Sequence, residues 1–209
     1  MIILKLKSFF KYYIPLAIVF SFLYGAANYL TELREFHYNF YLPFELYIPF
    51  IPEFIFAYLS LNFYFFFMNY ILTEKELRGI IRGKYMILIV SVVLFLLFPA
   101  NLGYSRDFKD YNGLLFLYSS LYTLDKPHNL VPSLHVCFAL ITMLGISRSQ
   151  NKSKLINAIS IIWFCLIVIS TIFTKQHHIL DVIAGLVVGY LGFVFSSRAF
   201  VGDMDGVPD

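Results

Sequence analysis

The sequence KQHHILD, residues 175–181, is a polar island between two long apolar segments. Residues 155–173 before it and 182–195 after it carry no charged side chain, which predicts an apolar helix on either side of the island. An ionisable cluster at the mouth of a membrane helix is costly to retain and usually has a function. This stretch therefore predicts a membrane fold and, at the junction of two of its helices, a candidate site.

His177 and Asp181 are four residues apart within this island, so on a helix they share one face and lie one turn apart. This spacing lets the carboxylate hold one imidazole nitrogen and leaves the other free to act as a nucleophile, a base or a metal ligand. A plain helix start is the alternative, because an acidic residue in a first turn interacts favourably with the helix dipole. The rest of the chain decides between the two interpretations.

The composition of the 209-residue chain is that of an integral membrane protein. Hydrophobic residues make up 59% and charged residues 14%, whereas a soluble domain is about half apolar and about a quarter charged. The two cysteines, Cys137 and Cys165, lie in apolar segments, so we expect no disulfide. The sequence has no glycine-rich nucleotide loop and no basic patch, which argues against nucleotides and nucleic acid as partners.

The apolar segments predict an all-α fold with six transmembrane helices, since each span needs about 20 residues. We expect the spans at residues 12–30, 54–72, 85–99, 133–146, 155–173 and 177–195. The first has some features of a signal peptide, but its length favours a retained helix. Residues 113–124, between spans three and four, are apolar but too short to cross, and predict a short interfacial helix or a re-entrant segment. Residues 1–200 then form one domain and residues 201–209 a disordered tail.

Basic residues are distributed unevenly between the loops of this arrangement. Ten Lys and Arg residues lie in segments 1–11, 73–84 and 147–154, on one side of the membrane, and five lie in segments on the other side. The positive-inside rule therefore predicts that both termini are cytoplasmic. The start of span four and the junction of spans five and six then face the non-cytoplasmic side, so we expect His135 and the 175–181 island to meet on that face.

A second polar cluster, PSLH at residues 132–135, stands at the start of span four. A proline and a hydroxyl residue before an apolar run form a helix-start signal, in which Ser133 caps the helix. This signal explains Pro132 and Ser133 but leaves His135 in the first turn at the membrane edge. Free backbone N–H groups there favour an anion, and a histidine beside a bound phosphate is placed to protonate a leaving oxygen.

PSLH, followed about forty residues later by His177 and Asp181, resembles the motif pair of the type 2 phosphatidic acid phosphatase (PAP2) superfamily of membrane lipid phosphatases and phosphotransferases. The PSLH form and the paired histidines are most similar to the branch of inositol phosphorylceramide synthases and related bacterial phosphatases. The resemblance implies His177 as nucleophile, Asp181 as the group that orients it, His135 as the acid that protonates the leaving alcohol, and Ser133 as a phosphate ligand. It also implies a bacterial inner (plasma) membrane protein with its active site on the non-cytoplasmic face.

The chain departs from the family pattern in its basic residues. The family's third motif has an arginine six residues before the nucleophile, and Thr171 occupies that position here. The first motif is not clear either, and Arg106 is the best match for its arginine. Because a phosphoryl-transfer site needs cations or hydrogen-bond donors for its equatorial oxygens, we expect phosphate contacts from Arg106, Lys126 and Lys175.

The resemblance implies a metal-independent phosphatase, without cofactor, that hydrolyses a lipid phosphomonoester or diphosphate through a phosphohistidine. The same residues serve a phosphotransferase that passes the phosphoryl group or head-group phosphate to an alcohol, so this alternative stays open. A third interpretation is a metal-dependent membrane hydrolase, with ligands from His135, His177, His178 and Asp181. Phosphatidic acid, phosphatidylglycerophosphate, an isoprenoid diphosphate and a lipid A phosphate are all compatible substrates.

Overall fold

The computed structural model describes residues 2–106, 111 and 113–197, and the predicted tail at 201–209 lies outside the described residues. The described residues form helices and no extended strand beyond a single bridge between Tyr38 and Ala100, which confirms the all-α prediction. The elements are α1 (Ile2–Glu32), η1 (Pro43–Tyr47), η2 (Pro52–Phe54), α2 (Ile55–Leu59), α3 (Leu61–Ile71), α4 (Glu74–Leu97), α5 (Leu115–Leu124), α6 (Leu134–Arg148), α7 (Lys154–Phe173) and α8 (Ile179–Ser196).

Within the described part of the chain, five helical segments are long and apolar enough to cross a membrane. They are Leu4–Glu32, Pro52–Ile71, Glu74–Leu97, Lys154–Phe173 and Ile179–Ser196. The predicted fourth span corresponds to α6, whose 15 residues extend only about 22 Å, against about 30 Å for the hydrocarbon core of a bilayer. A membrane fold is therefore supported, and a sixth complete span is not established.

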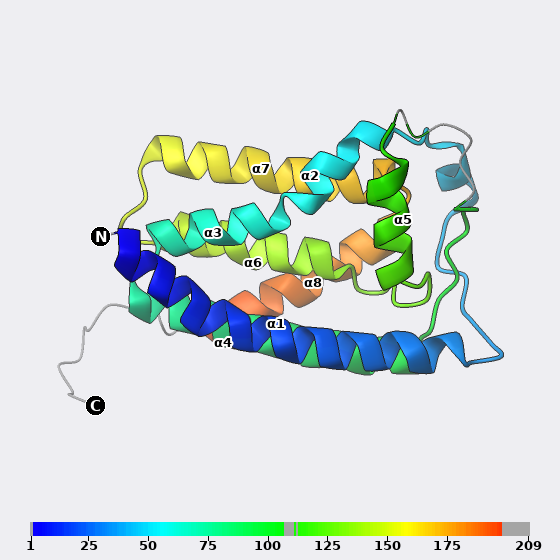
Figure 1. Ribbon diagram of the computed structural model, residues 1–209, viewed down its shortest axis with the longest axis horizontal. Coiled ribbons are helices and arrows are strands. Elements are labelled where there is room, and N and C mark those ends of the chain that lie inside the picture. Colours follow the sequence, from blue (N-terminus) through cyan, green and yellow to red (C-terminus); the bar gives the residue numbers. More distant parts are fainter. Residues whose placement is uncertain (1, 107–110, 112, 198–209) are drawn as a thin grey trace.

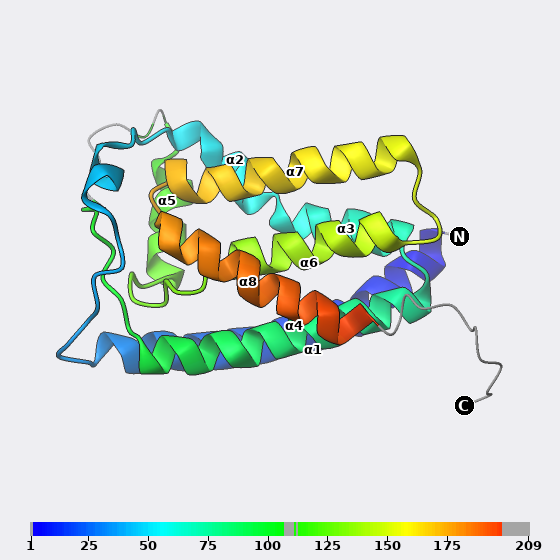
Figure 2. The same ribbon diagram turned by 180° about the vertical axis from the view of Figure 1, so that it is seen from behind.

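The long helices lie side by side, and the short helix α5 lies across one end of them (Figure 1). The start of α1 and the loop from α6 to α7 lie at the opposite end, as both views show (Figures 1 and 2). The beginnings of α6 and α8 point to the α5 end. The two polar motifs, 132–135 and 175–181, are therefore brought to the same end of the bundle.

The segment 73–84, which the sequence suggested as a loop, is instead the cap and first three turns of α4. Thr73 accepts a hydrogen bond from the Glu76 backbone N–H, and the Glu76 carboxylate accepts one from the Thr73 N–H, forming a capping box. Lys84 is fully buried, with its ammonium nitrogen 3.2 Å from the centroid of the Phe65 ring. Charged residues made this segment resemble a loop, but the cap and the aromatic contact stabilise it as a helix.

Helices α6 and α8 approach each other almost backbone to backbone. A Cβ atom at Gly185 would lie 2.9 Å from the carbonyl oxygen of Ser133, and one at Gly189 would lie 2.9 Å from that of Cys137. Only glycine permits this approach without a shift of the helices, as in the close packing of membrane helices through small residues. The first turn of α6 is thereby held directly against α8.

Candidate active site

The imidazole of His177 contacts the carboxylate of Asp181, as the spacing suggested. Nδ1 of His177 lies 3.3 Å from Oδ2 of Asp181, and the same oxygen accepts a hydrogen bond of 2.8 Å from the His178 backbone N–H. Because His178 is the N-cap of α8, His177 lies before the helix and not on its face. The contact therefore arises from the capping geometry of the helix start, which the helical-face argument did not anticipate.

The chain reaches His177 through a tight helix end. Lys175 has φ 56°, in the left-handed region, and its N–H donates to the Ile172 carbonyl, while the Gln176 N–H donates to that of Thr171. This pair of bonds is the Schellman arrangement, in which glycine usually occupies the left-handed position. The Thr171 carbonyl also accepts a hydrogen bond of 3.0 Å from the His177 N–H. Thr171, at the position of the family's arginine, therefore fixes the backbone of His177.

The start of α6 is tied to the same place. Ser133 is the N-cap of α6 and its hydroxyl accepts a hydrogen bond of 3.5 Å from the Val136 N–H. Its own N–H donates to the Asp181 backbone carbonyl at 3.0 Å. The ring of His135 stacks on that of Tyr58, with 3.8 Å between centroids and 21° between planes. The helix-start interpretation of Ser133 thus holds, and the same cap places His135 beside α8.

His135 and His177 line one cavity of about 400 Å³, called here the histidine cavity. Its other lining residues are Phe20, Ser21, Tyr24, Gly25, Tyr58, Leu121, Leu124, Asp125, Asn129 and Leu134. Asp125 accepts a short hydrogen bond from the Tyr24 hydroxyl. Burial raises the pKa of the Asp125 carboxyl, against the opposing effects of the Tyr24 hydrogen bond and the Arg106 charge. The sequence analysis did not single out Asp125 for a role in the site.

The three basic residues predicted to bind phosphate lie in different places. Arg106 donates to the Asp125 backbone carbonyl, and its guanidinium lies 4.6 Å from the centroid of the Tyr122 ring. Its Nε is buried and has no hydrogen-bond partner in the part of the chain described. Lys126 pairs with Glu32 at 3.3 Å, about half exposed. Arg106 is therefore next to a wall of the histidine cavity, whereas Lys126 is turned toward the end of α1.

Lys175 points away from the histidine cavity into a neighbouring surface hollow. Its ammonium lies 3.9 Å from the centroid of the Tyr104 ring and 3.4 Å from the carbonyl oxygen of Glu45. Burial lowers the pKa of Lys175, partly opposed by the Glu45 charge. The geometry thus does not bring Lys175 together with His135 and His177.

A buried carboxylate that the sequence analysis missed supports the same loop from outside. Glu45 Oε2 accepts a hydrogen bond of 2.8 Å from the Ile179 N–H and lies 3.2 Å from Nδ1 of His178, and Oε1 accepts one of 2.8 Å from the Leu42 N–H. Glu45 is the only charged residue between positions 38 and 52, and this isolation in an apolar segment is the sequence signal that could have identified it. Glu45 therefore anchors the start of α8 on the side opposite to Asp181.

His178 is part of this anchor. The Gly103 N–H donates to Nε2 of His178 at 3.2 Å, so that nitrogen carries no proton and Nδ1 donates to Glu45. The ring is stacked between Tyr41 and Tyr104, at 5.0 and 4.5 Å. Burial lowers the pKa of His178, although the charges of Asp181 and Glu45 oppose this effect. His178 thus has its ring nitrogens engaged outside the histidine cavity.

The contacts of His177 and His178 argue against the interpretation of these residues as metal ligands. Of the four residues proposed as ligands, His178 is directed to Glu45, and His177 to the carboxylate of Asp181. Across residues 2–106, 111 and 113–197, no group of three or more His, Cys, Asp or Glu side chains is arranged to hold a metal ion. The donor set described here fits an oriented histidine better than a metal centre.

Comparison with known proteins agrees with the motif pair. A sequence profile described as the PAP2 superfamily matches residues 45–195, which include Glu45, both histidine motifs and most of α8. No curated protein and no solved structure matches the chain. The profile covers well over half of the sequence, and the residues it spans contain the whole of the histidine cavity except its α1 wall. The chain belongs to the PAP2 superfamily of phosphatase-type proteins.

Proposed function

We propose that the protein is a membrane lipid phosphate phosphatase that works through a phosphohistidine on His177. The observation that carries this proposal is the pairing of the His177 imidazole with Asp181 at 3.3 Å, with His135 in the wall of the same cavity. With the proton of His177 on Nδ1, directed to Asp181, the lone pair of Nε2 is free to attack phosphorus. An oriented nucleophile and a second histidine supply the attacking group and the proton donor of a two-step phosphoryl transfer.

In the first step Nε2 of His177 forms the N–P bond, and the P–O bond to the lipid alcohol breaks. The proton that the leaving oxygen needs comes from His135. In the second step water attacks the phosphohistidine, the N–P bond breaks, and His135 takes the proton from water. Asp181 stabilises the positive charge that develops on His177 and keeps the ring in position.

Arg106 is the proposed principal phosphate contact. Its unpartnered Nε and its position beside Asp125 leave hydrogen-bond donors near the histidine cavity, and a planar guanidinium suits phosphate oxygens better than an ammonium does. Ser133 and the backbone N–H groups at the start of α6 are proposed to complete the contacts. Lys126 and Lys175 are secondary, because their ammonium groups have partners elsewhere.

For the membrane arrangement we propose six passes, with α6 as the shortest, and α5 lying at the interface beside the active site. We also propose a bacterial inner membrane, cytoplasmic termini and a non-cytoplasmic site, as well as membership of the PSLH branch. A cysteine introduced at exposed position 35 should be labelled by an impermeant reagent added outside intact cells, and one at exposed position 150 should not. The reverse labelling would invert this topology.

Phosphate release from a lipid panel tests the activity itself. The purified protein should release phosphate from at least one of phosphatidic acid, phosphatidylglycerophosphate, an isoprenoid diphosphate and a lipid A phosphate, with the same rate in excess chelator. Adding an alcohol acceptor distinguishes hydrolysis from transfer, since a transferase would form the new phosphoester at the expense of free phosphate. Loss of activity in chelator would contradict the proposal and favour a metal-dependent hydrolase.

A further inference from the structure

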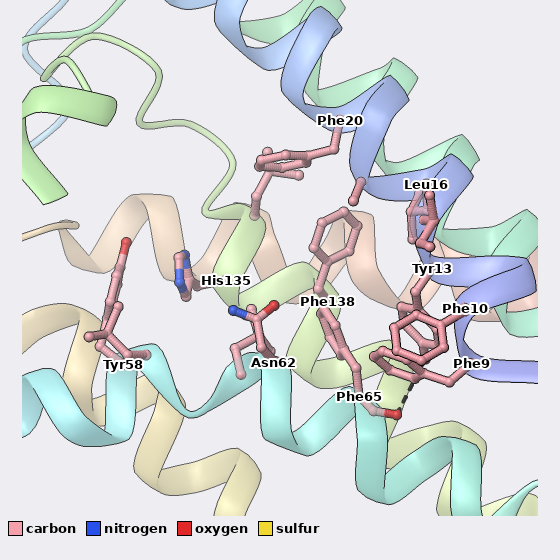
Figure 3. Close-up of a pocket in the computed structure, with 15 residues that line it drawn as sticks. Phe9, Phe10, Tyr13, Leu16, Phe20, Tyr58, Asn62, Phe65, His135 and Phe138 are labelled. Carbon is pink, nitrogen blue, oxygen red and sulfur yellow. Dashed lines mark hydrogen bonds between the residues drawn. The ribbon is translucent and has the colours of Figure 1, made fainter. Parts of the chain in front are cut away.

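A second cavity, of about 410 Å³, adjoins the histidine cavity and follows α1. It lies between α1, α2, α3 and α6 and is called here the α1 groove. The two cavities meet at four residues that line both of them, Phe20, Tyr58, Leu134 and His135. Figure 3 shows His135 and Tyr58 at one end of the groove and Phe9 and Phe10 at the other.

The two cavities differ in the charged and titratable groups that they contain. Both are lined mainly by apolar and aromatic side chains, but the histidine cavity also contains the carboxyl of Asp125 and the imidazole of His177, whereas the lining of the groove beyond His135 has no charged side chain. A site with a polar head and an apolar continuation matches an amphiphile whose charged group and hydrocarbon chain are joined at one atom. His135 lies where that joining atom would be.

The length of the groove suits one hydrocarbon chain. From Phe20 to Phe9 the groove follows eleven residues of α1, or about 16 Å at 1.5 Å per residue. That distance is about half of the roughly 30 Å hydrocarbon core, which is the depth of one leaflet. A chain that starts at His135 would therefore lie along α1 for about the depth that it otherwise occupies in lipid, in a groove whose rim residues Phe10 and Ile14 are exposed.

An aromatic stack lies at the far end of the groove (Figure 3). The rings of Phe9 and Tyr13 stack at 4.4 Å, and those of Tyr13 and Phe65 at 5.7 Å. Behind them lies Lys84, with its ammonium 3.2 Å from the centroid of the Phe65 ring and no hydrogen-bond partner among the described residues. The cation–π attraction between an ammonium group and aromatic rings is stronger at membrane depth, because little water is present to solvate the cation. Lys84 thus pins the stack that limits the groove.

We propose that the α1 groove binds one hydrocarbon chain of the lipid phosphate, with the phosphate at His177, the leaving oxygen at His135 and the chain end at the Phe9–Tyr13–Phe65 stack. The inference rests on the proposed function for the identity of the head group. It adds where the hydrocarbon part of the leaving lipid alcohol is held, since the apolar groove extends from the His135 side. A second chain of a two-chain lipid would stay in the surrounding bilayer.

A photoreactive alkyl phosphate tests this directly. The probe is dodecyl phosphate with a diazirine at its last carbon, crosslinked to the full-length protein in lipid nanodiscs and mapped by mass spectrometry. We expect label on Phe9 and Phe65, at the far end of the groove. Label spread over the exposed faces of α7 and α8, as on a lipid-immersed surface, would overturn the inference.

A matched pair of α1 variants supplies the control. Ala17 lines the groove three residues below Phe20, so Ala17→Phe should block the chain and abolish label at Phe9. Ala26 is exposed on the same helix, nine residues after Ala17, and therefore lies on the opposite face of α1. Ala26→Phe should leave the labelling of Phe9 unchanged. Equal labelling of Phe9 in both variants would also overturn the inference.

Phosphate release, measured in parallel, separates this inference from the proposed function. Butyl phosphate is too short to reach past Ala17 and reports the chemistry without the groove. Release from butyl phosphate together with unlabelled Phe9 would overturn the groove and leave the phosphatase proposal standing. Label at Phe9 that is lost in Ala17→Phe supports the groove even where no alkyl phosphate is hydrolysed, an outcome that would contradict the proposed function alone.

Discussion

Replacement of Glu45 perturbs the candidate site without touching the histidine cavity. Its carboxylate is fully buried and interacts with the N–H groups of Leu42 and Ile179 and with the His178 ring. At about 1.5 kcal/mol for each hydrogen bond to a charged group, Glu45→Ala should lower the free energy of unfolding by roughly 4–5 kcal/mol. Glu45→Gln keeps one acceptor oxygen for Ile179 and loses the Leu42 bond and the charge, so we expect about 2 kcal/mol.

The effect on activity follows from where Glu45 is attached. Its carboxylate holds the two residues that follow His177, His178 and Ile179, and a displacement of about 1 Å at a reacting group can cost about a hundredfold in rate. We therefore expect kcat for phosphate release to fall about a hundredfold in Glu45→Ala, with KM little changed because Glu45 does not line the cavity. For Glu45→Gln, which keeps part of the anchor, we expect a kcat between those of the parent protein and Glu45→Ala.

Thermal unfolding in detergent and steady-state phosphate release measure the two effects. For a chain of this size, each kcal/mol corresponds to about 2–4 °C in Tm, so Glu45→Ala should unfold about 10 °C earlier or more. Glu35→Ala, an exposed acid in the same connection, is the control and should stay within about 0.5 kcal/mol of the parent. Unchanged Tm and kcat in Glu45→Ala, or a change confined to KM, would refute the anchoring role.

Three further predictions concern the chemistry and the pH response. His177→Ala should lower kcat by at least about ten-thousandfold, and Asp181→Asn by about a hundredfold to a thousandfold; a larger loss in the aspartate variant would mean that the roles are assigned wrongly. Arg106→Lys should lower kcat/KM about tenfold and Arg106→Ala about a hundredfold or more, and full activity in the alanine variant would exclude Arg106 as the phosphate contact. Burial lowers the pKa of His178, so its neutral form is favoured in the folded state; Tm should therefore fall as pH drops below about 6.5, and should fall less steeply in a folded His178→Gln protein.

Helices made of uninterrupted apolar sequence could be predicted closely. The spans expected at 54–72 and 155–173 correspond to Pro52–Ile71 and Lys154–Phe173, because long segments without charge admit few alternatives in a membrane. The contact of His177 with Asp181 was also predicted, because it is local, although it arises from the cap of α8 and not from a shared helical face. Both the spans and this contact are determined by short, local stretches of sequence.

Features that depend on distant partners could not be predicted in this way. Lys84 lies in a charged segment that is typical of a loop. Its burial is explained by the rings of Phe65, Tyr13 and Phe138, which other helices contribute. Glu45 is separated from His178 by more than a hundred residues, so no local spacing joins them. The position of Lys126 likewise depends on Glu32 at the end of α1. Long-range electrostatic pairing is the part of the site that one sequence does not reveal.

The glycine contacts at Gly185 and Gly189 make α6 and α8 a single stiff unit, since interlocked backbones have no slack to take up a displacement. Breathing of the histidine cavity must then come from its opposite wall, formed by α1 and α5. Amide hydrogen exchange should accordingly be slowest along the facing turns of α6 and α8 and faster in α5. Movement of that wall would then open the cavity without displacing the first turns of α6 and α8, which are joined by the hydrogen bond from the Ser133 N–H to the Asp181 carbonyl.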